Sequence, residues 1–179
     1  MTLDNFLASV ERRAFSMARL ASRSDTEALD IVQDTMLKLV QKYRHKPSQE
    51  WPMLFQRILQ NRILDWHRQN TRNRRLFWWS DTDNIDNEDS TNWIETAADP
   101  SDGNPAQLLA RADDIQQIMA AIELLPIRQQ QAFLLRAWEG FDVSDTAEIM
   151  RCTKGSVKTH FFRAQARLKT LLEASDEPC

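Results

Sequence analysis

The chain has 179 residues, a formal net charge of −3 and 42% hydrophobic residues, which excludes wholesale disorder and suits one domain or two small ones. Its 3 glycines, single tyrosine and few β-branched runs favour an all-α fold. No apolar run approaches the roughly 18 residues that cross a bilayer. The N-terminal stretch has early acids and no unbroken apolar core, so it does not resemble a secretory signal, and we expect a cytoplasmic protein.

The small net charge hides an uneven distribution along the chain. Residues 1–79 carry 14 Lys and Arg against 8 Asp and Glu, whereas residues 80–105 carry 8 acids and no base. Residues 106–179 are nearly balanced, but positions 151–169 hold 6 basic residues and no acid. The sequence therefore predicts two small helical domains, 1–79 and 106–179, each with a basic surface, joined by a flexible acidic linker.

Helical periodicity begins at residues 3–21 and returns at about 26–43, with Ser24 or Asp25 placed to cap the second helix. One side of this second helix is apolar and suits a core. Its other face is mixed, and we expect it to meet a partner helix through Asp30, Gln33, Asp34, Leu37 and Lys38.

After a polar loop at 44–50, the spacing predicts a long helix over 51–75 whose basic residues fall in one stripe. The stripe consists of Arg57, Asn61, Arg68, Arg72 and Arg75. Such a stripe fits a phosphate backbone, and it equally fits a solvated, arginine-rich surface helix. The aromatic run at 77–79 is more typical of core or interface packing than of base stacking.

The acidic segment 80–105 lacks sustained periodicity, and Trp93 and Ile94 form an isolated apolar pair within it. Two interpretations stay open for this linker. It is either a solubilising spacer or an acidic strand that occupies a groove built for nucleic acid.

Helical periodicity resumes at 106–125 and is ended by Pro126. The next predicted helix covers 128–139, and Gly140 closes it. We expect its inward residues to be Phe133, Leu134, Ala137 and Trp138.

A short helix over 143–150, capped by Asp142, precedes a turn at 151–153 and a helix from 154 or 155 to 173. This order predicts a helix-turn-helix, whose second helix enters the major groove with its N-terminal half. As a bare pattern it is only moderately specific. Its outward residues are predicted to be Lys154, Ser156, Lys158, Thr159, Arg163 and Arg167.

Residues for metal or covalent chemistry are sparse. Cys152 suits apolar packing, Cys179 suits a free thiol near the end of the chain, and neither has ligand spacing. A nuclease that uses Asp65 and His67 is disfavoured, because residues two apart on a helix diverge. We expect no metal, no cofactor, no catalytic residue and no enzymatic activity.

The stretch from Gly140 to Leu168 resembles, without gaps, region 4 of bacterial RNA polymerase sigma factors. The similarity includes Glu148–Ile149, Gly155–Lys158 and Arg163–Ala164. This resemblance implies that the helix-turn-helix reads the minus-thirty-five element of a promoter.

Two earlier stretches resemble sigma region 2. Residues 28–35 are similar to the helix that grips the clamp of the largest polymerase subunit, and 51–75 to the part that melts and reads the minus-ten element. Two such parts without a third domain between them are typical of the extracytoplasmic-function (ECF) group. The resemblance covers about 8–79 and 106–173.

The resemblance implies a role for each matching position. Clamp contacts would come from Asp30, Gln33, Asp34 and Leu37. Minus-ten contacts, including a pocket for a flipped base near Tyr43 and Trp51, would come from Tyr43, Trp51, Arg57, Asn61, Arg62, Arg68, Arg72 and Arg75. Minus-thirty-five contacts would come from Lys154, Ser156, Lys158, Thr159, Arg163 and Arg167. The linker would thread the RNA exit path.

The implied partners are core RNA polymerase, through its clamp and the flap of the second subunit, and promoter DNA. Whether an anti-sigma factor binds the chain stays open. The function implied is promoter-specific transcription initiation, and the alternative is a stand-alone helix-turn-helix regulator.

Several positions depart from the family pattern. Arg151 stands where glycine is usual, Thr146 where a large aliphatic residue is usual, and Leu29 where an acid is usual. Val40 replaces a common aromatic residue. Arg62 falls within the apolar arc of its helix, so we expect it to need a carboxylate partner.

Overall fold

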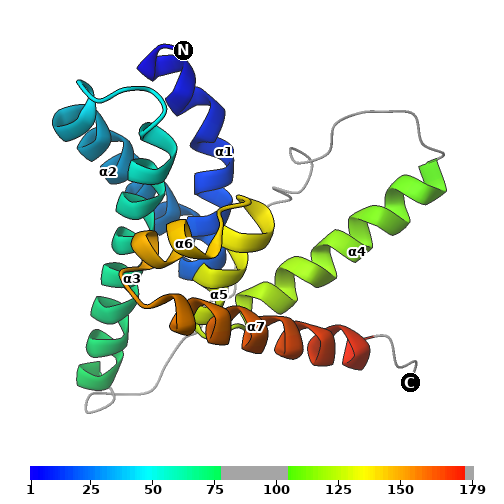
Figure 1. The fold of residues 1–179 in the computed structure, drawn as a ribbon. Coiled ribbons are helices and arrows are strands. Elements are labelled where there is room, and N and C mark those ends of the chain that lie inside the picture. The colour runs from blue at the N-terminus through cyan, green and yellow to red at the C-terminus, as the bar shows by residue number, and fades with distance from the viewer. Residues whose placement is uncertain (78–104, 176–179) are drawn as a thin grey trace.

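The structure is a computed structural model that describes residues 1–77 and 105–175 (Figure 1). Side chains are described for residues 1–73 and 114–174. Every regular element in these ranges is a helix, which confirms the all-α prediction. The first three are α1 (Leu3–Ser22), α2 (Asp25–Tyr43) and α3 (Trp51–Phe77), and together they form the N-terminal bundle.

The C-terminal bundle contains the remaining elements. These are α4 (Pro105–Glu123), α5 (Ile127–Phe133), the π-helical turn η2 (Leu134–Trp138), α6 (Val143–Met150) and α7 (Lys154–Ser175). Trp78, Trp79 and the whole predicted linker lie outside the described residues.

Local sequence signals account for where the helices begin. Ser24 caps α2, since its hydroxyl accepts a hydrogen bond from the Glu27 amide. Of the two predicted capping residues, Ser24 and Asp25, the structure therefore selects Ser24. Asp142 caps α6 in the same way, with 2.7 Å between its Oδ1 and the Asp145 nitrogen. The predicted boundaries therefore match the structure closely, since capping and periodicity agree.

The helix predicted at 128–139 is interrupted. Its second part is the π-helical turn η2, which inserts extra backbone and rotates the residues that follow. Leu135 is consequently buried, whereas Ala137 is exposed. The prediction that Ala137 faces inward is wrong for this reason.

One hydrophobic core runs through both bundles. Met17, Leu39 and Leu59 of the N-terminal bundle belong to the same buried cluster as Ile122 and Ala164 of the C-terminal bundle. A second, smaller cluster lies under the helix-turn-helix and is formed by Ala132, Leu135, Ala147, Ile149, Met150 and Val157. Met53 of α3 packs against this second cluster, so even the smaller core draws on both bundles.

Two buried glutamines of α5 join the bundles by hydrogen bonds to main-chain oxygens. Gln130 Nε2 donates to the carbonyls of Leu20, at 3.3 Å, and Ile122, at 3.0 Å. Gln131 Nε2 donates to the carbonyl of Gln60 at 3.0 Å. These polar contacts position α5 against the ends of α1 and the middle of α3.

Candidate nucleic-acid and polymerase interface

Helix α3 buries one side and presents polar groups on the other. Its buried apolar residues are Trp51, Leu54, Phe55, Ile58, Leu59 and Ile63. Arg68 and Arg72 are exposed, while Arg57 and Asn61 are half-buried. Arg75 lies in α3, but its side chain is outside the described residues. Over the residues whose side chains are described, the predicted basic stripe therefore lies at the surface of α3.

Three arginines of α3 already have carboxylate partners. Arg62 pairs with Asp34 of α2, which supplies the partner that its place in the apolar arc required. Arg68 Nη1 lies 3.7 Å from Asp65 Oδ1 on the same helix. The carboxylate for the third, Arg57, comes from Glu148 of α6, with 3.6 Å between Nη1 and Oε1.

The loop before α3 is held by Trp51, the first residue of that helix. Trp51 is only 6% exposed, and its ring packs against Phe6 with 5.8 Å between centroids. Its indole nitrogen donates to the Tyr43 carbonyl at 3.3 Å. Tyr43 itself is half-buried. The structure thus brings the two predicted pocket residues together, with Trp51 fixing the end of α2 to the start of α3.

The mixed face of α2 is exposed, as predicted. Asp30, Gln33 and Asp34 are all exposed, and Leu37 is 56% exposed. Leu29, where the family pattern has an acid, is 51% exposed on the same helix. Leu29 and Leu37 thus add exposed apolar area to a helix face that also carries Asp30 and Asp34.

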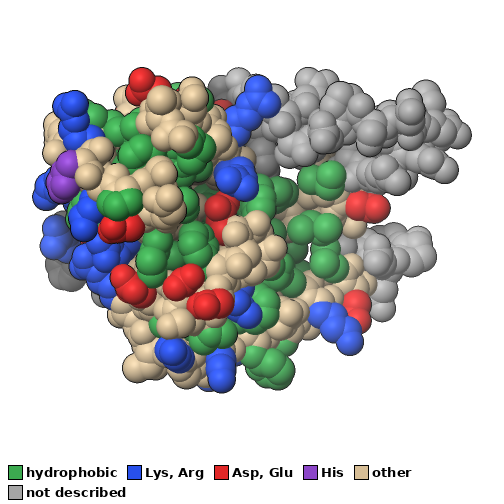
Figure 2. Space-filling model, turned by 45° about the horizontal axis from the view of Figure 1, so that its top comes forward, with side chains coloured by type: hydrophobic (Ala, Val, Ile, Leu, Met, Phe, Trp, Pro, Cys, Tyr) green, Lys and Arg blue, Asp and Glu red, His purple; other side chains and the backbone are tan. Residues whose placement is uncertain are grey.

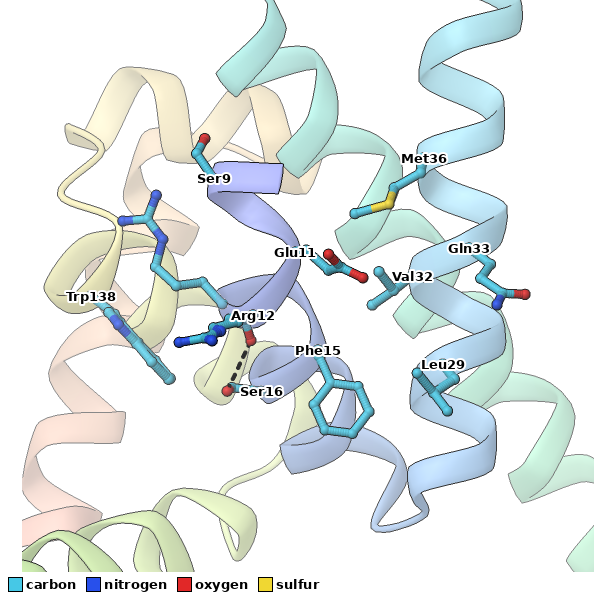
Figure 3. Close-up of a pocket in the computed structure, with 11 residues that line it drawn as sticks. Ser9, Glu11, Arg12, Phe15, Ser16, Leu29, Val32, Gln33, Met36 and Trp138 are labelled. Atoms are coloured by element: carbon cyan, nitrogen blue, oxygen red, sulfur yellow. Dashed lines mark hydrogen bonds between the residues drawn. The ribbon is translucent and has the colours of Figure 1, made fainter. Parts of the chain in front are cut away.

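An open groove of about 860 Å³ borders this face (Figure 3). Phe15 of α1 and Leu29, Val32 and Met36 of α2 form its apolar part, and Trp138 of η2 faces them across α1. Its polar lining includes Ser9, Glu11, Arg12, Arg13, Ser16 and Gln33. The groove is thus lined by both bundles, and it includes Gln33, a predicted clamp contact.

The turn between α6 and α7 has the geometry of a helix-turn-helix. Arg151 ends α6 in the left-handed region, with φ 51°, where glycine would be unstrained. Thr153 Oγ1 then accepts a hydrogen bond from the Ser156 nitrogen at 3.1 Å and caps α7. Arg128 Nη2 donates to the Met150 carbonyl at 2.9 Å, which ties α5 to the end of α6. Sequence reasoning did not assign Arg128 this role.

The outward face of α7 has few internal partners. Lys154, Lys158, Thr159 and Arg163 are exposed, as is Arg167, and Ser156 is half-buried. Within the part of the chain that the structure describes, none of the basic residues just named makes an ion pair. Lys169 pairs with Glu173 at 3.8 Å, beyond the N-terminal half of the helix.

His160 lies beside this face. Burial, and then the nearby Arg128 and Arg163 guanidinium groups, lower the pKa of His160 below its usual value. The lowered pKa favours the neutral imidazole, so the positive charge of this face comes from its lysines and arginines.

Helix α6 packs directly on α3, as Figure 1 shows where the two cross. The Arg57–Glu148 pair lies at this contact, and so does the Gln131 hydrogen bond to Gln60. The two basic surfaces therefore belong to one folded body in this arrangement. On the face shown in Figure 2, the densest group of Lys and Arg side chains lies at the left, others are scattered over the rest of the face, and Asp and Glu side chains lie among them.

The ends of α1 and α4 are also joined, because Arg23 Nη2, at the C-cap of α1, donates to the Glu123 carbonyl at 2.8 Å. Arg19 Nη1 lies 3.7 Å from Glu123 Oε1. Burial nevertheless raises the pKa of the Glu123 carboxyl, because it outweighs the opposing effects of Arg19 and Arg23.

Among the residues with described positions, no group of three or more His, Cys, Asp or Glu side chains is arranged to hold a metal ion. None of the helices, over those same residues, has the length and hydropathy needed to cross a membrane.

Family comparisons match both bundles. Residues 6–73 match the family Sigma-70 region 2, and residues 115–168 match the family Sigma-70, region 4. The chain is 29% identical over 171 residues to the ECF RNA polymerase sigma factor EcfG of Rhodopseudomonas palustris, covering 94% of this chain and 83% of that protein. It is 27% identical over 174 residues to the ECF RNA polymerase sigma factor SigM of Mycobacterium tuberculosis, covering 94% and 76%.

Solved structures show the same arrangement of helices. The sigma factor RpoE of Bartonella quintana, crystallised with the anti-sigma factor NepR, matches with a TM-score of 0.65 at 25% identity, covering 97% of this chain and 98% of that chain. CnrH in complex with the cytosolic domain of CnrY matches with a TM-score of 0.57 at 20% identity, covering 98% and 89%, and shows the fold alone.

Proposed function

The chain belongs to the ECF group of RNA polymerase sigma factors and directs transcription initiation, and from this premise we propose how its two bundles share promoter recognition. The C-terminal bundle holds the minus-thirty-five element as duplex. The N-terminal bundle binds the polymerase clamp and opens the minus-ten element. The observation that carries this division is the exposed face of α7, whose N-terminal half offers cations and hydroxyls without internal ion pairs in the described structure.

Duplex recognition by α7 follows from the orientation that its cap and turn impose. A recognition helix enters the major groove with its N-terminal residues at base edges, while its later cations meet phosphates. Ser156, Lys158 and Thr159 lie in the first two turns of α7, and Arg163 and Arg167 lie further along. We assign the first three to the bases and the last two to the backbone. Lys154, at the start of the helix, also reaches the backbone.

The surface of α3 that we assign to the minus-ten element has basic residues that already pair with carboxylates of the protein. Asn61 is half-buried between Arg57 and Arg68, and its amide suits an unstacked base. Arg57, Arg62, Arg68, Arg72 and Arg75 would hold the backbone of the non-template strand. Tyr43 would contact a flipped base, and buried Trp51 would position that part of the loop.

Core binding uses the exposed face of α2. Asp30, Gln33 and Asp34 provide acceptors for a basic clamp, and Leu37 provides an exposed apolar contact at their edge. We propose that the flap of the second polymerase subunit binds the C-terminal bundle. Because RNA polymerase works in the cytoplasm, we place the chain there. Sigma factors act by binding, so no catalytic step is assigned.

We infer that the two bundles separate during initiation. The two promoter elements lie about 25 base pairs apart, on the order of 80 Å at ~3.4 Å per base pair. The longest helix, α3, spans about 40 Å at ~1.5 Å per residue, and α6 contacts it directly. One closed body of this size cannot hold both elements, so the α3–α6 contact opens when the holoenzyme binds a promoter.

An anti-sigma factor is a further proposed partner. RpoE, which matches this chain over nearly its full length, was crystallised with an anti-sigma factor. The groove between α1, α2 and η2 has the apolar lining that an amphipathic helix needs, and both bundles contribute to it. A helix bound there would cover Gln33 and hold the bundles together.

The test is in-vitro transcription with core polymerase on a genomic promoter library. We expect transcripts with defined start sites that depend on this chain. If core polymerase and the chain form no holoenzyme, or if initiation stays random, the proposal fails. Strong specific binding of duplex promoter DNA by the chain alone would instead favour a stand-alone regulator.

A further inference from the structure

Among the residues whose side chains are described, the ion pairs that join the two bundles all have the same polarity. In each pair an arginine of the N-terminal bundle faces a glutamate of the C-terminal bundle, at N–O distances of 3.6 or 3.7 Å. The pairs are Arg13 with Glu139, Arg19 with Glu123, and Arg57 with Glu148. The two faces that meet in this structure therefore have complementary charges.

The pairs lie at separate points of the contact between the bundles. One joins α1 to the end of α4, the second joins α1 to the residue that follows η2, and the third joins α3 to α6. Complementary charges across an interface fix the register in which two surfaces meet. Because these points involve different helices on both sides, they favour one closed arrangement of the bundles over other ways of packing them.

The pairs differ in how strongly each stabilises the closed arrangement. The Glu139 side chain is only 9% exposed, and within the described structure its Oε1 has no hydrogen-bond partner, so Arg13 supplies its compensating charge. Glu148 is 60% exposed, which makes its pair with Arg57 weaker. At Glu123, burial outweighs the nearby arginines and raises the pKa of the carboxyl, so this pair orients the bundles without adding net stability.

The other contacts between the bundles respond differently to salt. The shared core is apolar, and the α5 glutamines donate to main-chain oxygens. Salt does not screen apolar burial in the way that it screens charge, and excluded solutes such as sucrose strengthen it. The Debye length falls from about 10 Å at 0.1 M salt to about 3 Å at 1 M, which is shorter than the distances within these pairs. The ion pairs are therefore the part of the contact that salt weakens.

We propose that these ion pairs hold the free chain closed, so that rising ionic strength shifts it toward an open form with separated bundles. This inference builds on the proposed separation of the bundles during initiation, and it adds a condition that controls the separation before polymerase binds. In the closed form α6 contacts α3 and pairs with Arg57. Opening therefore makes more of the α3 surface accessible.

Single-molecule energy transfer on the full-length free chain tests the proposal without polymerase or DNA. One dye is attached after Asn5→Cys in α1 and the other after Gln117→Cys in α4, at two exposed positions, with Cys152→Ser and Cys179→Ser removing the native thiols. The readout is the ratio of open, low-transfer molecules to closed, high-transfer ones. Between about 0.1 M and 1 M KCl we expect this ratio to rise roughly fivefold. Sucrose should not raise it.

Variants of the most buried pair give a sharper test. Arg13→Gln should raise the open-to-closed ratio at low salt, because it leaves the Glu139 carboxylate without its cation. Arg13→Gln combined with Glu139→Gln should return the ratio toward wild type and weaken its salt response, since two neutral amides need no counter-charge. Lys46→Gln is the matched control. It makes the same charge change in a pair with Glu50, inside the N-terminal bundle, and should leave the ratio and its salt response unchanged.

The inference is overturned if KCl does not raise the wild-type ratio, or if sucrose raises it as much as KCl does. It is also overturned if Arg13→Gln behaves like Lys46→Gln, or if the double variant stays as open as Arg13→Gln. The wild-type salt titration decides the matter even if a variant fails to fold. Failure of the proposed function is distinguishable, because a chain that opens with salt but supports no transcription would refute that function alone.

Discussion

The two proposed DNA-binding surfaces differ in whether their basic residues form ion pairs with carboxylates of the protein itself. On α3, Arg57, Arg62 and Arg68 each meet a carboxylate, and two of these carboxylates come from other helices. On α7, Lys158 and Arg163 extend outward without an ion pair in the described part of the chain. In the division of roles that we propose, the C-terminal surface would bind duplex DNA without breaking ion pairs of the described structure, whereas the N-terminal surface would exchange protein partners for nucleic acid.

This difference agrees with the two tasks. A duplex is bound without rearrangement, so a rigid, exposed helix suits it. Melted DNA is bound only after core polymerase has engaged, so a surface whose cations are held by Glu148 and Asp34 stays partly occupied until then. The comparison predicts that mutations in the shared core, in α2, and on the two DNA surfaces have separable effects.

The largest effect is expected in the shared core. Leu59 is fully buried in α3, and Leu59→Ala should cost about 2–5 kcal/mol of the free energy of unfolding. Because one core runs through both bundles, thermal unfolding of the variant should remain a single transition at lower temperature. Leu37→Ala, an exposed control, should change stability by no more than about 0.5 kcal/mol. Two separate calorimetric transitions in the wild-type chain would contradict the shared core.

The next effect concerns core polymerase. Asp34→Arg reverses an exposed charge on α2 and places it beside Arg62, so affinity for core polymerase should fall on the order of tenfold or more. Competition with a labelled sigma factor measures this affinity. Asp65→Arg gives the same charge change on α3 and should leave core binding close to wild type. Unchanged binding by Asp34→Arg would remove α2 from the clamp interface.

The third prediction separates the two DNA surfaces. Lys158→Ala should weaken use of the minus-thirty-five element by about 1–3 kcal/mol, since a base-edge contact is lost. Asn61→Ala should leave duplex docking intact and slow promoter opening. A promoter with a pre-melted minus-ten element should restore activity to Asn61→Ala and not to Lys158→Ala. An identical defect on both templates would show that the bundles do not divide the work.

The structural features that the sequence predicted correctly depend on residues close to one another along the chain. Helical spacing and capping residues such as Ser24 and Asp142 gave the helices and the helix-turn-helix. The resemblance to sigma factors is confirmed by family matches to both bundles. Arg151, which stands where glycine is usual in the family, is in the left-handed region. The roles assigned to individual site residues remain predictions.

Most of the features that could not be predicted from the sequence depend on contacts between residues that are far apart along the chain. Arg62 was expected to need a carboxylate, but only the folded structure identifies Asp34, which lies 28 positions earlier. The packing of α6 on α3 and the pairing of Glu148 with Arg57 have no local signal. The π-helical turn at η2 exposed Ala137, since a regular helical period does not allow for inserted backbone.

The fourth prediction concerns the support of the C-terminal surface. Thr146 of α6 is fully buried, and its hydroxyl has no hydrogen-bond partner among the described residues. Thr146→Val keeps the shape and removes the unsatisfied hydroxyl, so it should raise the free energy of unfolding by about 1 kcal/mol. Chemical denaturation measures this change. Ser144→Ala, at an exposed position of the same helix, serves as the control, and a loss of stability in Thr146→Val would show that the hydroxyl is satisfied.

The smallest effect is expected where the two surfaces meet. Glu148→Gln frees Arg57, and because the Glu148 side chain is exposed, the pair is worth at most about 1 kcal/mol. Binding of a single-stranded minus-ten oligonucleotide by the free chain should therefore improve by no more than about fivefold, and salt should reduce the gain. Glu173→Gln makes the same charge change on α7, where its partner is Lys169, and should leave this binding near wild type. Equal gains in oligonucleotide binding by both variants would show that the effect comes from net charge. The proposed contrast between the ion-paired surface of α3 and the surface of α7 would then be wrong.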